Sequence, residues 1–259
     1  MSATLLDGKV VAAGIREEVK AEVEALRAKG IAPKLSVILA GDDPASIVYA
    51  RSKEKSCSKV GIDFELTTFP GNVEEAELMA KVDELNKDPK VHGIMIELPL
   101  PKHIDKKKVM EAVDPKKDVD GVHPINRGYI LSGSEGLFPA TPESCIEIML
   151  RSGVEIKGKN VCLIGRGETV GKPLVFMLLN QNATITVCHS KTTDLAYHTK
   201  QADIIVSAVG RQNTLTADMV KPGTVVVDAA IVQLENGICG DASLTASNKD
   251  ARVKNSGLA

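Results

Sequence analysis

Three side chains that could bind a planar molecule and move protons occur close together near the start of the chain. Ser46, Tyr49 and Lys53 are separated by three and four residues, so a helix would place them on one face. An amine on that face could donate or accept a proton beside an aromatic ring. Taken alone, the pattern is more typical of a surface tyrosine and a solvated lysine. The assignment therefore depends on the motifs that accompany it.

A second candidate site is a glycine-rich turn in the second half of the chain. Gly165, Gly167 and Gly171 stand where an apolar run gives way to a helical pattern. Glycines there let backbone amides approach a pyrophosphate, and the helix dipole favours the anion. The spacing is one residue longer than the usual dinucleotide fingerprint, so an ordinary tight turn is the alternative.

The residues after the next apolar run bear on which dinucleotide would bind. An acidic residue that would accept hydrogen bonds from the ribose of NAD is missing there. Ser190 and Lys191 stand in its place, and with Arg166 they could bind a 2′-phosphate. The sequence thus favours NADP over NAD, although Lys191 as a solvated charge is the alternative. Ile231, after a later strand, is expected to flank the nicotinamide.

The elements that must position these residues alternate between strand and helix. Apolar periodicity predicts helices at residues 10–26, 46–60 and 73–85, and a further helix opening at Thr141. Short apolar runs predict strands at residues 35–40, 63–69, 93–98, 160–164, 183–188, 203–209 and 224–229. The order predicts an α/β protein whose second half is a Rossmann-like parallel sheet.

The chain is expected to form two domains. Residues 114–138 read as a loop, and Thr141 opens a helix after it, so the boundary is placed near Pro139. The expected domains are residues 1–139 and 140–241. Residues 242–259 are polar and lack an apolar face, a composition typical of a disordered tail.

Composition excludes several classes of partner. The 259 residues carry 32 basic and 34 acidic side chains, and a net charge of -2 gives no basic field for nucleic acid or an anionic membrane. No apolar run is long enough to span a bilayer, and no secretory leader is visible. The five cysteines are scattered, unlike a disulfide framework or a zinc site, so no metal is expected. A cytoplasmic protein is predicted.

Several motifs occur in a distinctive order along the chain. They are Asp42 to Ser46 with Tyr49 and Lys53, Gly93 to Pro101, Lys117 to Gly121, Thr141 with Pro142, Gly165 to Pro173, and His189 to Thr192. Together they resemble the bifunctional methylenetetrahydrofolate dehydrogenase/cyclohydrolase family. The resemblance extends from about residue 6 to residue 241, and the order of motifs is far more specific than a glycine turn.

The resemblance implies roles for residues of the first domain. Tyr49 would stack on the folate, Lys53 would lie beside the reacting one-carbon unit, and Asp120 would hydrogen-bond the pterin ring. The implied partners are a tetrahydrofolate derivative and NADP. Members of the family have a folate-binding catalytic domain that faces a Rossmann-like domain across a cleft, commonly in a homodimer.

The family activity implied is NADP-dependent oxidation of 5,10-methylenetetrahydrofolate, with hydrolysis of the methenyl product to 10-formyltetrahydrofolate. Oxidation demands orientation, whereas hydrolysis needs an amine that exchanges protons. Lys53 is the candidate for that amine. The alternative is a catalytically weak folate- or nucleotide-binding protein that acts through a partner. A glycine-loop dehydrogenase for another small substrate would require the first-half motifs to be coincidental.

Glu97 departs from the family pattern, which has glutamine at this position. If the geometry is kept, the Glu97 carboxylate lies near Lys53 and favours its charged form, so a neutral amine becomes scarcer. Hydrolysis would then be impaired more than oxidation. The alternatives are that Glu97 turns away or is itself a proton acceptor. Lys53, Glu97 and Asp120 are thus the candidate catalytic residues.

The end of the chain departs further from the family pattern. Beyond Asp241 the family continues into a glycine- and proline-rich loop over the folate and a helix that returns to the first domain. Residues 242–259 contain neither sequence. A more open substrate site and weaker positioning are therefore expected.

Overall fold

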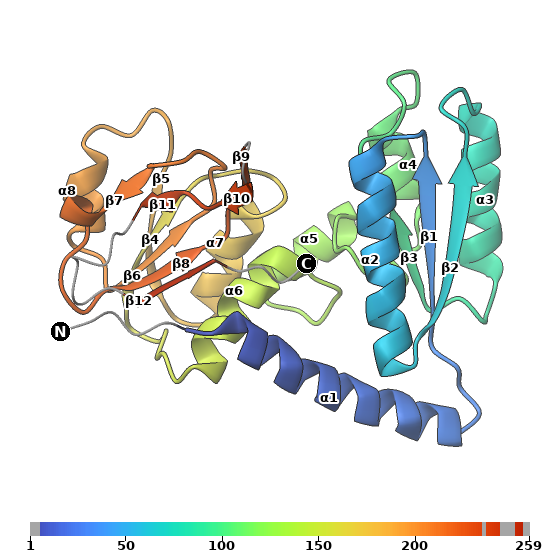
Figure 1. Ribbon diagram of the computed structural model, residues 1–259, viewed down its shortest axis with the longest axis horizontal. Coiled ribbons are helices and arrows are strands. Elements are labelled where there is room, and N and C mark those ends of the chain that lie inside the picture. Colours follow the sequence, from blue (N-terminus) through green and yellow to red (C-terminus); the bar gives the residue numbers. More distant parts are fainter. Residues whose placement is uncertain (1–5, 235–236, 244–251, 256–259) are drawn as a thin grey trace. The chain divides into compact units, whose positions relative to one another are not determined.

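The computed structural model describes residues 6–234, 237–243 and 252–255. These residues form two compact units, each with its own parallel sheet (Figure 1). The N-terminal unit comprises residues 13–129 and 135–138, and the C-terminal unit comprises residues 6–12, 130–134 and the described residues from 139 onward. The division falls within helices α1 (Gly8–Ala28) and α5 (Pro124–Ser132).

Three parallel strands form the sheet of the N-terminal unit. Strand β1 (Lys34–Ala40) lies between β2 (Asp63–Phe69) and β3 (Gly93–Ile96). Residues 36–40 of β1 are all buried, as expected for a central strand that is covered on both faces. The three strands confirm the strands predicted in the first half of the chain.

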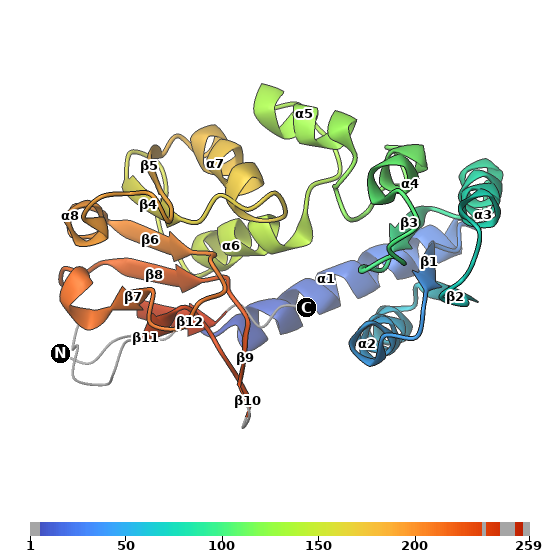
Figure 2. The ribbon, with the colours of Figure 1, turned by 90° about the horizontal axis from the view of Figure 1, so that it is seen from above.

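Helices cover both faces of this sheet. Helix α2 (Pro44–Val60) lies on one face, and α3 (Glu75–Lys87) and α4 (Lys106–Ala112) lie on the other (Figure 2). Asp43 caps α2 by accepting a hydrogen bond from the Ser46 amide at 2.8 Å. Gly61, with a φ of 81°, ends the helix in the left-handed conformation. These local signals fix where α2 begins and ends.

Five parallel strands form the sheet of the C-terminal unit, in the order β12-β8-β6-β4-β5. Their bounds are β4 Asn160–Ile164, β5 Thr184–Cys188, β6 Ile204–Ser207, β8 Val225–Asp228 and β12 Arg252–Asn255. Two short pairs accompany the sheet: β7 (Leu215–Thr216) with β11 (Ala242–Ser243), and β9 (Val232–Leu234) with β10 (Gly237–Cys239). The predicted α/β class and Rossmann-like sheet are confirmed.

The helices of the C-terminal unit supply the apolar cover of this sheet. Helices α6 (Ala140–Arg151) and α7 (Gly171–Asn180) contact each other, and α7 also contacts β4 and β5. Helix α8 (Leu195–Thr199) and the 3-10 helix η1 (Ala217–Met219) contribute Leu195 and Met219 to a cluster around Cys162 and Ile164. None of the helices in the described ranges is long and apolar enough to cross a membrane.

The structure differs from the sequence prediction at residues 114–138, which were expected to form a loop. Helix α5 occupies residues 124–132 of this stretch. Its Pro124 stands at the helix start, where the missing amide costs nothing. Ile125, Tyr129 and Leu131 are exposed, whereas Ile130 is buried. Because the apolar residues do not form one stripe, the pattern gave no helical signal.

The tail expected at residues 242–259 also differs from the prediction where it is described. Strand β11 pairs with β7, and β12 pairs in parallel with β8. Pairing of this kind is made by backbone groups, so a polar sequence can join a sheet edge without a side-chain signature. The remaining residues of the tail, 244–251 and 256–259, lie outside the described residues.

Candidate active site

The amine of Lys53 is the centre of the candidate site in the N-terminal unit. Its Nζ lies 2.5 Å from Glu97 Oε1 and 3.8 Å from the centroid of the Tyr49 ring. The Lys53 side chain is 17% exposed and that of Glu97 is 6% exposed, so the ion pair is largely withdrawn from water. Tyr49 remains 43% exposed, and its ring is therefore open to a ligand. The structure brings these three predicted residues together.

Two adjoining elements place the members of this group. Tyr49 and Lys53 are one helical turn apart on α2, as their spacing predicts. Glu97 follows β3, and its amide donates to the Ile38 carbonyl at 2.8 Å, which extends the sheet pairing by one residue. The Ser46 hydroxyl lies 3.2 Å from the Leu98 carbonyl and so joins the start of α2 to the segment after β3. The ion pair is thus built on two fixed backbones.

Asp120 lies within electrostatic reach of the same group. Burial raises the pKa of its carboxyl; the Lys53 ammonium opposes this shift, and the charges of Asp118 and Glu97 add to it. Burial likewise raises the pKa of the Tyr49 hydroxyl, with further contributions from Glu97 and Asp120. The four candidate residues of this unit therefore share one electrostatic environment.

This arrangement combines an amine, two carboxylates and an exposed aromatic face. An amine held beside a carboxylate can donate a proton and take one back. An aromatic face can stack on a planar heterocycle, and carboxylates can accept hydrogen bonds from its ring nitrogens. The site suits proton transfer on a bound heterocyclic cation or amine.

Sequence reasoning assigned Asp120 but missed the residues that hold its loop. The Lys117 ammonium donates to the carbonyls of Leu85, Asn86 and Asp88, at 3.0, 2.8 and 2.7 Å, and so caps the end of α3. Asp118, 2% exposed, accepts hydrogen bonds from the His123 amide and the Asn126 side chain at 2.8 and 2.9 Å. The sequence feature that could have identified Lys117 and Asp118 is their place in the same motif as Asp120, residues 117–121.

The glycine turn of the C-terminal unit is a close-packed backbone turn. Gly165 has a φ of 115°, and a Cβ there would lie 2.4 Å from the Ala208 carbonyl oxygen. A Cβ on Gly171, the first residue of α7, would lie 2.5 Å from the Gly165 carbonyl oxygen. Only glycine therefore fits at either position. Arg166 and Gly167, between them, are exposed.

This turn fits a dinucleotide. The Lys172 amide at the start of α7 donates to the Gly167 carbonyl at 2.9 Å, and Pro173 has no amide hydrogen. A pyrophosphate would therefore meet the positive end of the helix dipole and the glycine backbone of the turn. A Cβ on Gly167 would meet no atom within 4 Å, so the space beside it is open. The cradle is the one expected for the pyrophosphate of NADP.

The remaining predicted nucleotide contacts follow neighbouring strands. Ile164, at the end of β4, pairs with Cys188, at the end of β5, so Arg166 and Ser190 each stand two residues beyond their strand at the same edge of the sheet. Ser190 and Lys191 are exposed. Ile231 follows β8 and is 63% exposed. Each of these side chains is accessible to a ligand.

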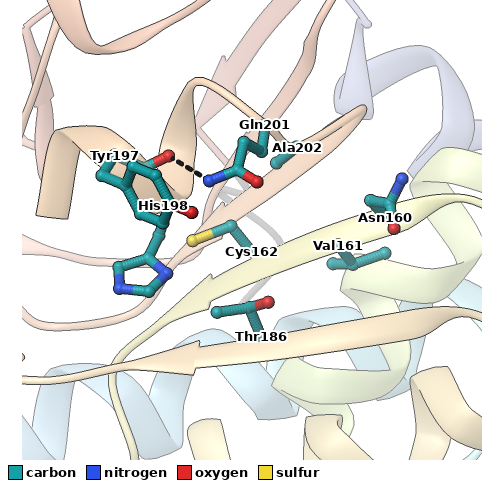
Figure 3. A pocket seen from close by; sticks show the side chains of 8 residues that line it. All are labelled: Asn160, Val161, Cys162, Thr186, Tyr197, His198, Gln201 and Ala202. Atoms are coloured by element: carbon teal, nitrogen blue, oxygen red, sulfur yellow. Dashed lines mark hydrogen bonds between the residues drawn. The ribbon is translucent and has the colours of Figure 1, made fainter.

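A cavity of 420 Å³ lies elsewhere in the C-terminal unit and was not predicted (Figure 3). Its lining residues are Asn160, Val161, Cys162, Thr186, Tyr197, His198, Gln201 and Ala202. None of the candidate site residues belongs to this set. Burial raises the pKa of the Cys162 thiol in this lining, which leaves the thiol a poor nucleophile. Within the described ranges, no group of three or more His, Cys, Asp or Glu residues could hold a metal ion.

Comparison with known proteins gives matches along both units. Residues 6–120 match the family model described as tetrahydrofolate dehydrogenase/cyclohydrolase, catalytic domain. Residues 139–255 match the model for the NAD(P)-binding domain of the same family. The two models together span most of the chain.

Curated relatives and solved structures agree with these matches. The chain is 64% identical over 239 residues to bifunctional protein FolD 2 of Desulfitobacterium hafniense, covering 92% of this chain and 84% of that protein. It resembles the crystal structure of FolD from Campylobacter jejuni, with 44% identity, a TM-score of 0.94 and coverage of 97% and 90%. It also resembles the FolD of Trypanosoma brucei complexed with NADP and an inhibitor, with 34% identity, a TM-score of 0.89 and coverage of 98% and 90%.

Proposed function

Because this chain belongs to the tetrahydrofolate dehydrogenase/cyclohydrolase family, we propose that Tyr49, Lys53, Glu97 and Asp120 form the site at which its folate substrate reacts. The protein is an NADP-dependent methylenetetrahydrofolate dehydrogenase with methenyltetrahydrofolate cyclohydrolase activity. The relatives that support this are bifunctional enzymes, so a catalytically weak binding protein is not favoured. The observation that carries the site proposal is the Lys53 amine, 2.5 Å from Glu97 and 3.8 Å from the Tyr49 ring.

In the oxidation, the chain's own residues orient the substrate. Loss of a hydride from the methylene carbon leaves an amidinium cation across the two folate nitrogens, and NADP, when bound, supplies the hydride acceptor. The Tyr49 ring would stack on the pterin, and Asp120 would accept hydrogen bonds from it. The Glu97 carboxylate would lie near the carbon on which positive charge develops.

Hydrolysis requires proton movement as well. Water adds to the amidinium carbon and loses one proton, which leaves a hydroxyl on that carbon. The carbon–nitrogen bond to N5 then breaks as N5 gains a proton, and the hydroxyl releases its own proton to solvent to leave a formyl group on N10. Lys53 can take the proton from water when its amine is neutral and return it to N5 as that bond breaks. Glu97, whose Oε1 lies 2.5 Å from the Lys53 amine, would hold that amine in position.

The test is an absorbance assay with methylenetetrahydrofolate and NADP. Formation of NADPH and of methenyltetrahydrofolate reports oxidation, and decay of added methenyltetrahydrofolate reports hydrolysis. We expect Lys53→Met to lose hydrolysis by at least about a hundredfold. Lys55→Met, a change to an exposed lysine of the same helix, should leave both rates unaltered. Full hydrolysis in Lys53→Met would refute the role given to the amine.

We propose that residues of the glycine turn and of the neighbouring strand ends bind NADP. Gly165, Gly167 and Gly171 would receive the pyrophosphate, and Arg166, Ser190 and Lys191 would bind the 2′-phosphate, while Ile231 would flank the nicotinamide. The close-packed turn and the accessible side chains at one sheet edge support this assignment. A titration of native protein and Arg166→Ser with both nucleotides tests it: the KM for NADP should rise while that for NAD stays the same.

We also propose a domain boundary, a cellular location and an oligomeric state for the whole protein. We place the boundary between its domains at residues 139 and 140, which is supported by the second family match beginning at residue 139. We infer a cytoplasmic location, which the five free thiols favour. We also propose a homodimer, because strand β5 is an edge of the described sheet and contains neither a charged residue nor a proline.

A further inference from the structure

Asp241 is a fully buried carboxylate in the C-terminal unit that no step above uses. Its Oδ2 accepts hydrogen bonds from the Ser207 hydroxyl and the Val209 amide, both at 2.7 Å. Its Oδ1 accepts one from the Arg211 amide at 2.6 Å. A carboxylate buried among three donors keeps each of them in one place, since losing it would leave them unsatisfied.

All three donors belong to one segment of chain. Ser207 is the last residue of β6, and Val209 and Arg211 follow it. The backbone carbonyl of Asp241 also accepts from the Thr214 amide at 2.9 Å. Asp241 therefore contacts both ends of this segment: its side chain binds Ser207 at the end of β6, and its backbone carbonyl binds the Thr214 amide.

The neighbours of Asp241 hold a second segment. The Ala242 amide donates to Asp228 Oδ2 at 2.9 Å, and the Ala230 amide donates to Asp228 Oδ1 at 3.1 Å. A Cβ on Gly240 would lie 2.0 Å from Asp228 Oδ2, so only glycine fits there. Residues 240–242 thus join the segment after β6 to the segment after β8.

These two segments leave adjacent strands at the edge of the sheet where ligands bind in open α/β sheets. Ser207 pairs with Asp228 in the register of β6 and β8. Ala208 lies against the glycine turn, because a Cβ on Gly165 would meet its carbonyl oxygen at 2.4 Å. The segment that Asp241 holds is therefore in contact with the turn that we assign to the pyrophosphate.

We propose that Asp241 is a positioning residue of the nucleotide site, which acts through the amides of Val209 and Arg211 and does not itself touch the nucleotide. The inference rests on the proposed function. It predicts that loss of the carboxylate weakens NADP binding selectively, because residues 208–213 lose their fixed path beside the glycine turn, while the folate site in the other unit keeps its own supports.

Asp241→Asn tests this, because the amide has one acceptor oxygen where the carboxylate has two. We expect the KM for NADP to rise about tenfold or more, with the KM for methylenetetrahydrofolate within about twofold of native. Hydrogen exchange of the Val209 and Arg211 amides should also accelerate. Ser207→Ala removes a single donor and should raise the KM for NADP by about threefold. It serves as the deciding variant if Asp241→Asn does not fold.

Asp203→Asn is the matched control, because this carboxylate accepts from the Asn160 amide at 3.0 Å at the opposite end of β6. It should leave the KM for NADP unaltered. The proposal is overturned if Ser207→Ala and every folded Asp241 variant bind NADP as native protein does, or if both KM values shift together. If native protein neither binds NADPH in calorimetry nor oxidises methylenetetrahydrofolate, the proposed function fails. The exchange rates of the Val209 and Arg211 amides then still decide whether Asp241 orders residues 208–213.

Discussion

At the scale of single residues, Glu97 is the departure from the expected family pattern that lies beside Lys53. The resemblance implies glutamine at residue 97, and the structure places the Glu97 carboxylate 2.5 Å from the Lys53 amine. An amide at this position could also orient the amine, but it would add no charge. A carboxylate beside the reacting carbon would stabilise a cation on the bound folate. We therefore expect Glu97 to favour oxidation over hydrolysis.

Glu97→Gln should shift that balance. We expect the ratio of the cyclohydrolase rate to the dehydrogenase rate to rise about tenfold or more, because without the carboxylate the cationic methenyl form is stabilised less, which slows its formation and favours its hydrolysis. The two rates are measured by the absorbance assays on the same preparation. Glu54→Gln, which removes an exposed ion pair with Arg51 on the same helix, is the control. An unaltered ratio in Glu97→Gln would contradict the charge argument.

Asp120 gives a prediction for the pH dependence of stability. Burial raises the pKa of this carboxyl in the folded protein, so between its unfolded and folded pKa values the native state binds more protons than the unfolded state. The contribution of Asp120 to stability therefore falls as pH rises from about 4, and levels off above the folded pKa. The amide of Asp120→Asn does not ionise, so this variant lacks that pH-dependent contribution to stability.

Urea unfolding of both proteins between pH 4 and pH 7 measures this difference. We expect the stability of native protein relative to Asp120→Asn to decline across that range. A difference that stays constant with pH, or that grows in favour of native protein, would show that the carboxyl is not destabilised by burial.

At the scale of elements, the glycine turn before α7 offers a matched pair of substitutions. Gly171→Ala would bring a Cβ to 2.5–2.8 Å from three backbone atoms, whereas Gly167→Ala would enter open space. We expect Gly171→Ala to lower the free energy of unfolding by about 2 kcal/mol, and Gly167→Ala to alter it by less than about 0.5 kcal/mol. Urea denaturation followed by circular dichroism distinguishes the two. Equal tolerance of both changes would refute the close packing of this turn.

At the scale of the whole molecule, the proposed homodimer can be tested at the edge strand β5. Val187 in this strand is 37% exposed. If β5 pairs with its counterpart in a second copy, Val187→Lys places like charges across the pair and should convert the dimer to a monomer. Sedimentation equilibrium of native protein and the variant checks this. A native monomer, or a variant that remains dimeric, would rule out association through β5.

The sequence by itself determined much of this protein, because the relevant signals are local. Apolar runs predicted the main sheet strands, and spacing of four residues placed Tyr49 and Lys53 on one face of α2. The predicted start of that helix, residue 46, lies two residues after the observed one. The strand-to-helix change around Gly165 predicted the tight turn that the structure shows. Each depends on residues close together in the chain, so each is readable without a fold.

Only the tertiary structure decided which distant residues meet. Asp241 is 34 residues from Ser207, and no periodicity links such positions. Glu97 is 44 residues from Lys53, and only the resemblance to a known family gave reason to expect them together before the structure showed the contact. Helix α5 and strands β11 and β12 also escaped prediction, because their stability comes from contacts with other segments and not from an apolar pattern of their own. Chain topology, which brings the ends of parallel strands to one edge, supplied those contacts.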